Sequence, residues 1–190
     1  MNVVEQAKEL MYEQTKRNKA PAWILTQMAI EKGQELAKKY DVREDLVLTS
    51  LYLCHIVFDP IWKSDTQKNH PTLSKELALK YLNEWNVAEK DQEIILNSIE
   101  AHHNKVPATS KIAEVVKNAE CFKFVTVKGS LVWLHELGLR NVPFEEAVSK
   151  VIAKMKQKKA LLTLPDCIKE ADQNCKEIVK LFEDCNYYDI

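Results

Sequence analysis

Apolar residues recur along most of the chain at the three- and four-residue spacing of an amphipathic α-helix. Between positions 22 and 40, Ile24, Met28 and Leu36 supply one apolar face. The segment 44–58 is apolar almost all round, so we expect that helix in the middle of the fold. The pattern and its breakers predict helices at about 2–17, 22–40, 44–58, 73–85, 87–103, 111–126, from 143 onward, and 166–185.

Breaker residues and polar stretches divide these helices. Residues 61–69 have the composition of a polar loop, and His70-Pro71-Thr72 is expected to open the helix that follows. His135 is expected near the end of a further helix. The basic run Lys154–Lys159 lies on a predicted helix among acidic neighbours, and we interpret it as a solvated face. No repeat or linker interrupts the chain, which favours a single domain spanning residues 1–190.

The amino-acid composition limits which fold classes and which kinds of binding partner are expected. Only 3 of the 190 residues are glycine, which disfavours all-β folds and glycine-rich phosphate loops, so we predict an all-α helical bundle. The 27 Lys and Arg residues nearly balance the 28 Asp and Glu residues, leaving a net charge of -1. This balance gives no reason to expect binding to nucleic acid or to an anionic membrane.

The cysteines bear on the cellular compartment. There are five, without C-x-x-C spacing, and no apolar run approaches the length of a membrane span or a signal peptide. These features predict a cytoplasmic protein with unpaired thiols. Cys54 and Cys121 have apolar neighbours, and we expect both to be buried.

The histidines are the candidates for chemistry. Of the five, His55, His70 and the adjacent His102 and His103 fall at three predicted helix ends. Helical bundles build metal sites from inward-facing residues of different helices, and imidazole is the commonest metal ligand. The alternative for each histidine taken alone is a hydrogen-bonded core residue.

The order of these segments resembles the HD superfamily of metal-dependent phosphohydrolases. The resemblance rests on "LYLCHI", "NHPTLSKELALKYL", "IEAHHNKVPATSKIAEVVKNAECFKF" and "KALLTLPD", and covers a core of about 21–182. It implies a divalent metal (Mn, Fe, Ni, Mg or Zn) held by His55, His70, His102 and His103. It also implies hydrolysis of a phosphorylated small molecule, such as a nucleotide.

The sequence departs from the family pattern at three places. No histidine precedes His55; the family's first ligand would fall among residues 25–27, which read Leu25-Thr26-Gln27. The residue after His55 is Ile56, where the family has aspartate. Glu120 stands where the last aspartate is expected, one methylene longer. Each departure removes or alters a metal ligand, which weakens the site.

Further residues could complete the site. Asp59 follows His55 by four residues and could supply the missing carboxylate; the alternative is that it caps the helix end before Pro60. Lys63, Lys68 and Lys105 could meet substrate phosphate, the alternative being solvated surface lysines.

Three hypotheses about function follow. The first is an HD-type phosphohydrolase with a non-standard metal centre, in which no residue is yet assigned as catalytic. The second is an inactive HD-fold module that binds a ligand or a protein, and the third is a helical interaction scaffold. A homodimer is compatible with the sequence, which leaves the oligomeric state open.

Overall fold

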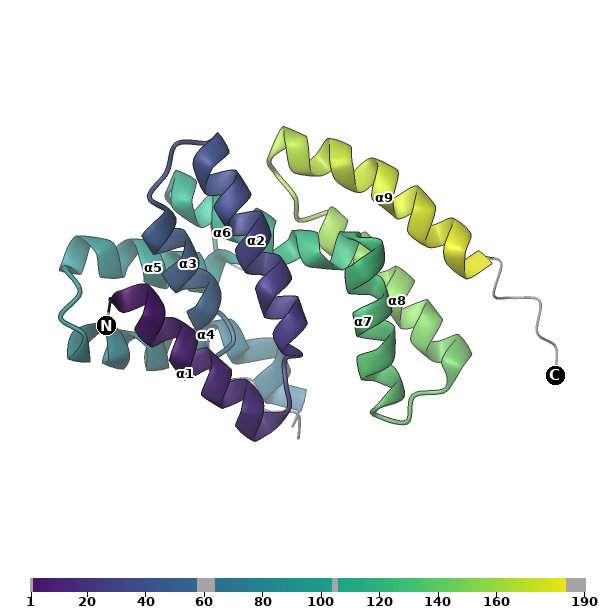
Figure 1. The fold of residues 1–190 in the computed structure, drawn as a ribbon, viewed down its shortest axis with the longest axis horizontal. Helices are drawn as coiled ribbons and strands as arrows, with labels where there is room; N and C mark the ends of the chain where they lie inside the picture. The colour runs from purple at the N-terminus through teal and green to yellow at the C-terminus, as the bar shows by residue number, and fades with distance from the viewer. Residues whose placement is uncertain (1, 58–63, 104–105, 184–190) are drawn as a thin grey trace. The chain divides into compact units, whose positions relative to one another are not determined.

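The structure is a computed structural model that describes residues 2–57, 64–103 and 106–183, with the backbone alone given for 64–68 (Figure 1). All regular structure in these ranges is helical and none of it is strand, which confirms the predicted all-α class. The helices are α1 Val3–Asn18, α2 Trp23–Lys39, α3 Glu44–Leu53, α4 Ser64–Glu84, α5 Glu89–Ala101, α6 Lys111–Phe122, the 3₁₀ helix η1 Lys123–Val125, α7 Val127–Gly138, α8 Phe144–Lys159 and α9 Pro165–Glu183.

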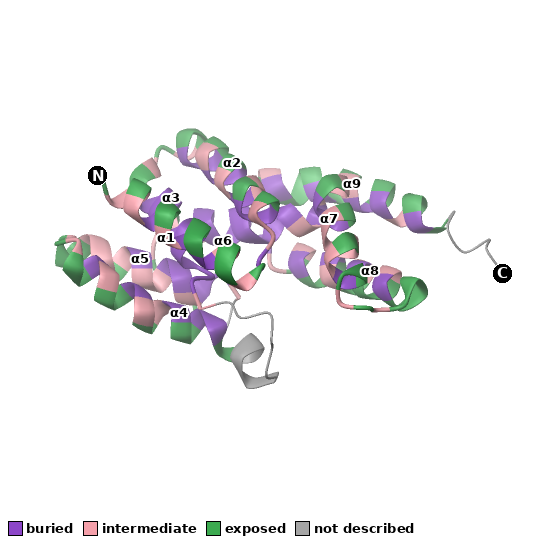
Figure 2. Cartoon of the chain, turned by 60° about the horizontal axis from the view of Figure 1, so that its bottom comes forward, coloured by how far each residue is buried: buried purple, intermediate pink, exposed green. Residues whose placement is uncertain are grey.

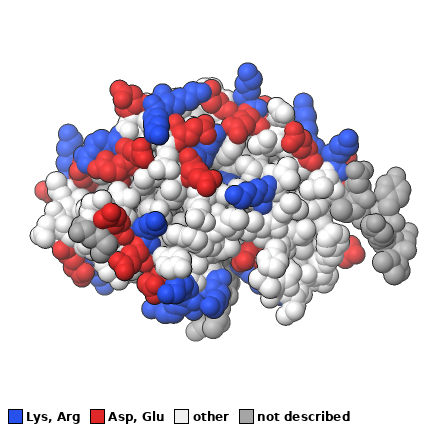
Figure 3. Space-filling view, viewed as in Figure 1, with Lys and Arg blue, Asp and Glu red and all other residues white. Residues whose placement is uncertain are grey.

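The chain forms two compact units, Met1–Glu120 and Cys121–Ile190. The first unit holds α1 to α5 and most of α6, and the second holds η1 and α7 to α9. The single domain expected from the sequence stays a prediction. None of the helices in the described ranges is long and apolar enough to cross a membrane. On the face drawn in Figure 3, basic and acidic side chains are interspersed.

Helix α3 is the centre of the first unit. It packs against α1, α2, α4 and α5, and every residue from Leu46 to Leu53 is buried, as the all-round apolar pattern predicted (Figure 2). Gly33 lets α2 approach α3 closely: a Cβ atom there would overlap Leu51 Cδ1 and lie 3.2 Å from Val47 Cγ1. Ala119 of α6 is also close, with its Cβ atom 3.8 Å from that position.

A charged network joins the beginnings of α3 and α5. The guanidinium of Arg43 donates to Asp45 and, through two bonds of 2.9 Å, to Asp91. The hydrogen bonds from Arg43 hold the pKa of Asp45 below its ordinary value. The pairing raises the pKa of Arg43, mainly through the bond to Asp45. This network links the start of α5, the helix capped by His102, to the start of the central helix.

Helix α4 begins earlier than the sequence suggested. We expected a loop over 61–69 and a helix from about 73, but the backbone is helical from Ser64, and Pro71 lies inside the helix. Proline is common in a first helical turn, which explains the error. It can also stand within a helix at the loss of one hydrogen bond, as it does here. His70 therefore lies inside α4 rather than at its start, where the sequence placed it.

Helix α3 is shorter than expected, ending at Leu53 with turns through Val57 instead of continuing to 58. His55 therefore lies in a turn just beyond the buried helix. The predicted helix over 111–126 divides into α6 and η1. His135 lies in the last turn of α7, as predicted.

The second unit is organised around η1, which contacts α7, α8 and α9. Thr126 caps α7 by accepting a hydrogen bond from the backbone N–H of Gly129 at 3.0 Å. A Cβ atom at Gly129 would overlap the carbonyl oxygen of Lys123, so this close approach requires glycine. One prediction fails in this unit. Lys158, in the basic run expected to be solvated, is 1% exposed, because the run faces η1 on one side.

Candidate metal centre

Three histidines from separate segments meet inside the first unit. His55 lies in the turn after α3, His70 on α4, and His102 at the end of α5. Each offers a ring nitrogen, and these three nitrogens lie within 4.8 Å of one another; all three residues are buried. Packing of α4 against both α3 and α5, with an ion pair of 2.6 Å between Lys75 and Glu100, holds the segments together.

The protonation of His102 follows from its hydrogen bonds. Its Nδ1 lies 2.5 Å from the carbonyl oxygen of Ile99. A carbonyl oxygen only accepts, so Nδ1 carries the proton and donates. In a neutral ring with this tautomer, Nε2 is the nitrogen that accepts a hydrogen bond or binds metal. A histidine whose second nitrogen is bonded in this way is oriented to bind metal through the first.

The Nε2 atom of His102 faces another imidazole. His102 Nε2 lies 3.3 Å from His70 Nε2. In a hydrogen bond between these two nitrogens one ring donates and the other accepts. Two nitrogens bound to one tetrahedral zinc ion, each at 2.0–2.1 Å, would lie about 3.3 Å apart. The spacing of this pair therefore fits two ligands of a single ion.

The third histidine is joined to a carboxylate. His55 Nε2 lies 2.6 Å from Oε1 of Glu120, and the side chains are 11% and 2% exposed. A carboxylate accepts, so His55 donates through Nε2. Glu120 stands on α6, one residue after Ala119. The glutamate that the sequence offered as a ligand is thus beside the histidines, although it lies outside the group whose donors all fall within 4.8 Å.

Two more polar residues lie near these groups. The half-buried ring of His103 is 4.7 Å from that of His70 and 4.4 Å from that of His102, measured between centroids. Ser74 follows His70 by one helical turn, which places both on one face of α4. Its buried hydroxyl has no hydrogen-bond partner in the described part of the chain. The motif containing Ser74 was recognised in the sequence, but no role was assigned to this serine.

Several predicted site residues are not placed. Asp59, Lys63 and Lys105 lie outside the described residues. Lys68 belongs to α4, and its side chain also lies outside them. The structure therefore leaves untested the proposed carboxylate and all three proposed phosphate contacts.

The structure describes the positions at which the resemblance to the HD superfamily predicts ligands that this sequence lacks. Ile56, at the position where the resemblance to the HD superfamily predicts aspartate, is an apolar side chain only 3% exposed. Leu25 and Thr26 are buried on α2, whereas Gln27 is exposed. Of the three positions considered for the first histidine, Gln27 is therefore the least suited to face a buried site. The predicted burial of Cys54 and Cys121 is confirmed.

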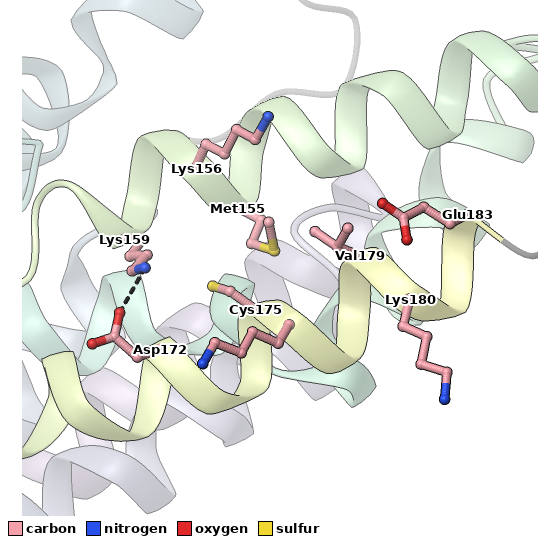
Figure 4. Close-up of a pocket in the computed structure, with 9 residues that line it drawn as sticks. Met155, Lys156, Lys159, Asp172, Cys175, Val179, Lys180 and Glu183 are labelled. Carbon is pink, nitrogen blue, oxygen red and sulfur yellow. Dashed lines mark ion pairs between the residues drawn. The ribbon is translucent and has the colours of Figure 1, made fainter.

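The second unit has a separate groove of about 500 Å³ between α8 and α9 (Figure 4). Met155, Cys175 and Val179 lie along it, and an ion pair of 2.6 Å joins Lys159 to Asp172 at its side. Burial raises the pKa of the Cys175 thiol, which makes it a poor nucleophile near neutral pH. None of the histidines lines this groove.

Comparison with known proteins informs the fold alone. No protein-family model matches the sequence, and no curated protein matches it. A crystal structure of a Lactobacillus plantarum protein, determined as a structural-genomics target, is similar with a TM-score of 0.71 and 15% sequence identity. The match covers 97% of this chain and 93% of that one. At this identity the likeness supports the helical fold across nearly the whole chain.

Proposed function

We propose that the first unit is a divalent-metal-dependent phosphohydrolase of the HD type, acting on a phosphorylated small molecule such as a nucleotide. The observation that carries the proposal is the cluster of His55, His70 and His102, with donors within 4.8 Å of one another. A histidine with a structural role forms hydrogen bonds with nearby groups, so three such histidines need not converge from separate segments. Histidines that bind one ion must converge.

The donor set favours some metals over others. Three imidazoles suit Zn²⁺, Fe²⁺ and Ni²⁺, and Mn²⁺ accepts a mixture of imidazole and carboxylate. Mg²⁺ prefers oxygen ligands and fits this set worst. Glu120, bonded to His55, would add one negative charge to the centre.

Each residue of the proposed centre has its own role. His55, His70 and His102 would hold the ion, which supplies Lewis acidity toward a phosphoryl oxygen when bound. The carbonyl of Ile99 fixes the tautomer of His102. Glu120 orients the ring of His55 through their hydrogen bond. His103 is half-buried beside the cluster and would face the substrate as a donor to phosphate.

A second function is favoured by one observation. Ile56 is buried where a carboxylate would complete the family's site. A centre with fewer charged ligands binds metal more weakly and activates water less. A module that binds a phosphorylated ligand without turnover would keep the histidines and tolerate this change.

The test is elemental analysis of protein purified without a metal-affinity tag, followed by phosphatase assays on nucleoside monophosphates with Mn²⁺, Ni²⁺ and Zn²⁺. We expect about one ion per chain, lost in His102→Ala and kept in His135→Ala, whose histidine is exposed on α7. Metal-dependent release of phosphate identifies an enzyme, and metal or ligand binding without release identifies the binding module. Equal metal content in the two variants would overturn the proposed centre.

A further inference from the structure

The groove between α8 and α9 is longer than the hollow described above. A second hollow of about 520 Å³ adjoins the first, since Lys156, Val179 and Glu183 line both. On α8 the lining residues extend from Val148 to Lys159. An α-helix rises about 16 Å over this distance, which is roughly three turns. The two hollows therefore form one elongated groove along most of α8.

The groove lies beside the packed face of α8. This helix packs against α7, α9 and η1, and Ala147 and Val151 are buried on its packed face. Val148 and Ile152, which follow them by one residue, are half-buried and line the groove. One residue turns an α-helix by about 100°, so α8 has a second apolar side next to its packed face. A helix with so wide an apolar surface can bury another element against it.

The floor of the groove is apolar. Met155 of α8 and the pair Cys175 and Val179 of α9 lie between the two helices (Figure 4). Met155, Cys175 and, in the second hollow, Phe182 are buried, and Val179 is half-buried. An occupant of the groove would therefore gain stability by burying apolar side chains of its own.

The edges of the groove are basic. Lys156 on α8 and Lys176 and Lys180 on α9 are exposed, and none of them has an ion-pair partner in the described part of the chain. The acidic lining residues there are Glu183 and one aspartate that is already paired with a lysine at 2.6 Å. Positive charge is thus in excess along the groove, which favours an occupant that carries negative charge.

Two other kinds of occupant fit the groove less well. A symmetric dimer brings the same surface of both copies together, so the unpaired lysines of one copy would face those of the other. Like charges across an interface are unfavourable. A pocket for a small molecule encloses most of its ligand, whereas this groove is open to solvent along its length.

We propose that the groove between α8 and α9 docks an acidic amphipathic helix of a partner protein. The apolar face of that helix lies on Met155 and Val179, with anchors spaced by three or four residues. Aspartate and glutamate beside those anchors meet Lys156 on one edge and Lys180 on the other. The groove contains none of the candidate metal ligands, so the proposal stands whether or not the hydrolase activity is found.

The experiment selects binders to the full-length protein from a display library of helical peptides of about 18 residues, or roughly five turns. One face of every peptide carries apolar residues at helical spacing. All other positions hold glutamate, lysine, glutamine or alanine at equal frequency, so the library itself has no charge preference. The recovered peptides should contain glutamate in excess of lysine by about threefold or more, because the groove is basic.

Variants of the full-length protein locate the binding site by fluorescence anisotropy with the recovered peptides. Val179→Asp places a charge on the apolar floor and should weaken binding by about tenfold or more. Lys180→Glu reverses a charge at the edge and should weaken binding by about threefold or more at low salt, and less at high salt. Lys128→Glu is the matched control, since Lys128 is exposed on α7 and lines neither hollow. It should bind like the unaltered protein.

The proposal is overturned if no peptide is recovered, if glutamate is not in excess, or if Lys180→Glu and Lys128→Glu bind the peptides equally. Lys180 is exposed, so this comparison remains decisive even if Val179→Asp does not fold. Two further results would also overturn it. A dimer of the unaltered protein that dissociates in Val179→Asp, measured by sedimentation, identifies a second copy as the occupant. Phosphatidylglycerol vesicles that bind the unaltered protein but not Lys180→Glu identify an anionic membrane.

Discussion

His55 and Glu120 form a buried hydrogen-bonded pair, with 2.6 Å between Nε2 and Oε1. The glutamate is almost fully enclosed at 2% exposure. A buried pair of this kind is costly to break, because the remaining partner stays in a poorly solvated place. The pair therefore links the candidate metal centre to the folding of the first unit, and its stability effect can be measured without metal.

Replacing Glu120 should test this link. Glu120→Leu removes the acceptor and should lower the free energy of unfolding by about 3 kcal/mol or more. Glu120→Gln keeps an acceptor oxygen and should cost about 1–2 kcal/mol. Urea unfolding in EDTA measures both. Equal small losses in the two variants would show that the contact contributes little.

Ile56→Asp should add a carboxylate ligand to the proposed metal centre. Without metal, a carboxylate at this buried position should lower stability by a few kcal/mol. Added Mn²⁺ or Ni²⁺ should then raise the melting temperature, because metal binds the folded state. Ile56→Asn has the same shape without the charge, and should lose stability with no rescue. If metal rescues neither, Ile56 is simply a core residue; a histidine added at Thr26 should strengthen a genuine rescue.

Gly33→Ala should destabilise the first unit, since the new Cβ atom would overlap Leu51 and press on Val47. We expect a loss of about 1–3 kcal/mol, as for other overpacked cores. Gly138→Ala is the control, with no atom within 4 Å of the added carbon. Better helix propensity should leave that variant unchanged or more stable by up to about 1 kcal/mol. A neutral Gly33→Ala would mean that α2 and α3 are less closely packed than described.

The Asp45 carboxylate should make stability depend on pH in the acid range. Arg43 lowers its pKa in the folded state, so its contribution is fully present above the unfolded value of about 3.9, and is lost as pH falls through the lower folded pKa. The gap in unfolding free energy between the unaltered protein and Asp45→Asn should shrink between pH 6 and pH 3. Both side chains are largely exposed, so the gap should be about 0.2–1 kcal/mol. A constant gap would count against the pairing.

Much of this architecture could be predicted because it depends on local patterns. The central place of α3 follows from its all-round apolar surface, and the order of the histidine-bearing segments predicted their convergence. The start of α4 could not be predicted in the same way, since Pro71 is compatible with both a first turn and a helix interior. Lys158 was misread because a lysine-rich run normally faces water, and burial of one member depends on η1, which packs against it from outside the run.

Helix α6 runs from Lys111 to Phe122, whereas the first unit ends at Glu120. The boundary thus falls within a helix, at the residue bonded to His55. A fragment cut at this boundary would end in a new α-carboxylate on Glu120 itself. The new α-carboxylate and the side-chain carboxylate of Glu120 would then both lie near the imidazole of His55. They would also stand at the C-terminal end of α6, where the helix dipole is negative. Any dissection of the chain should therefore retain at least Phe122, so that the terminus does not become a competing ligand.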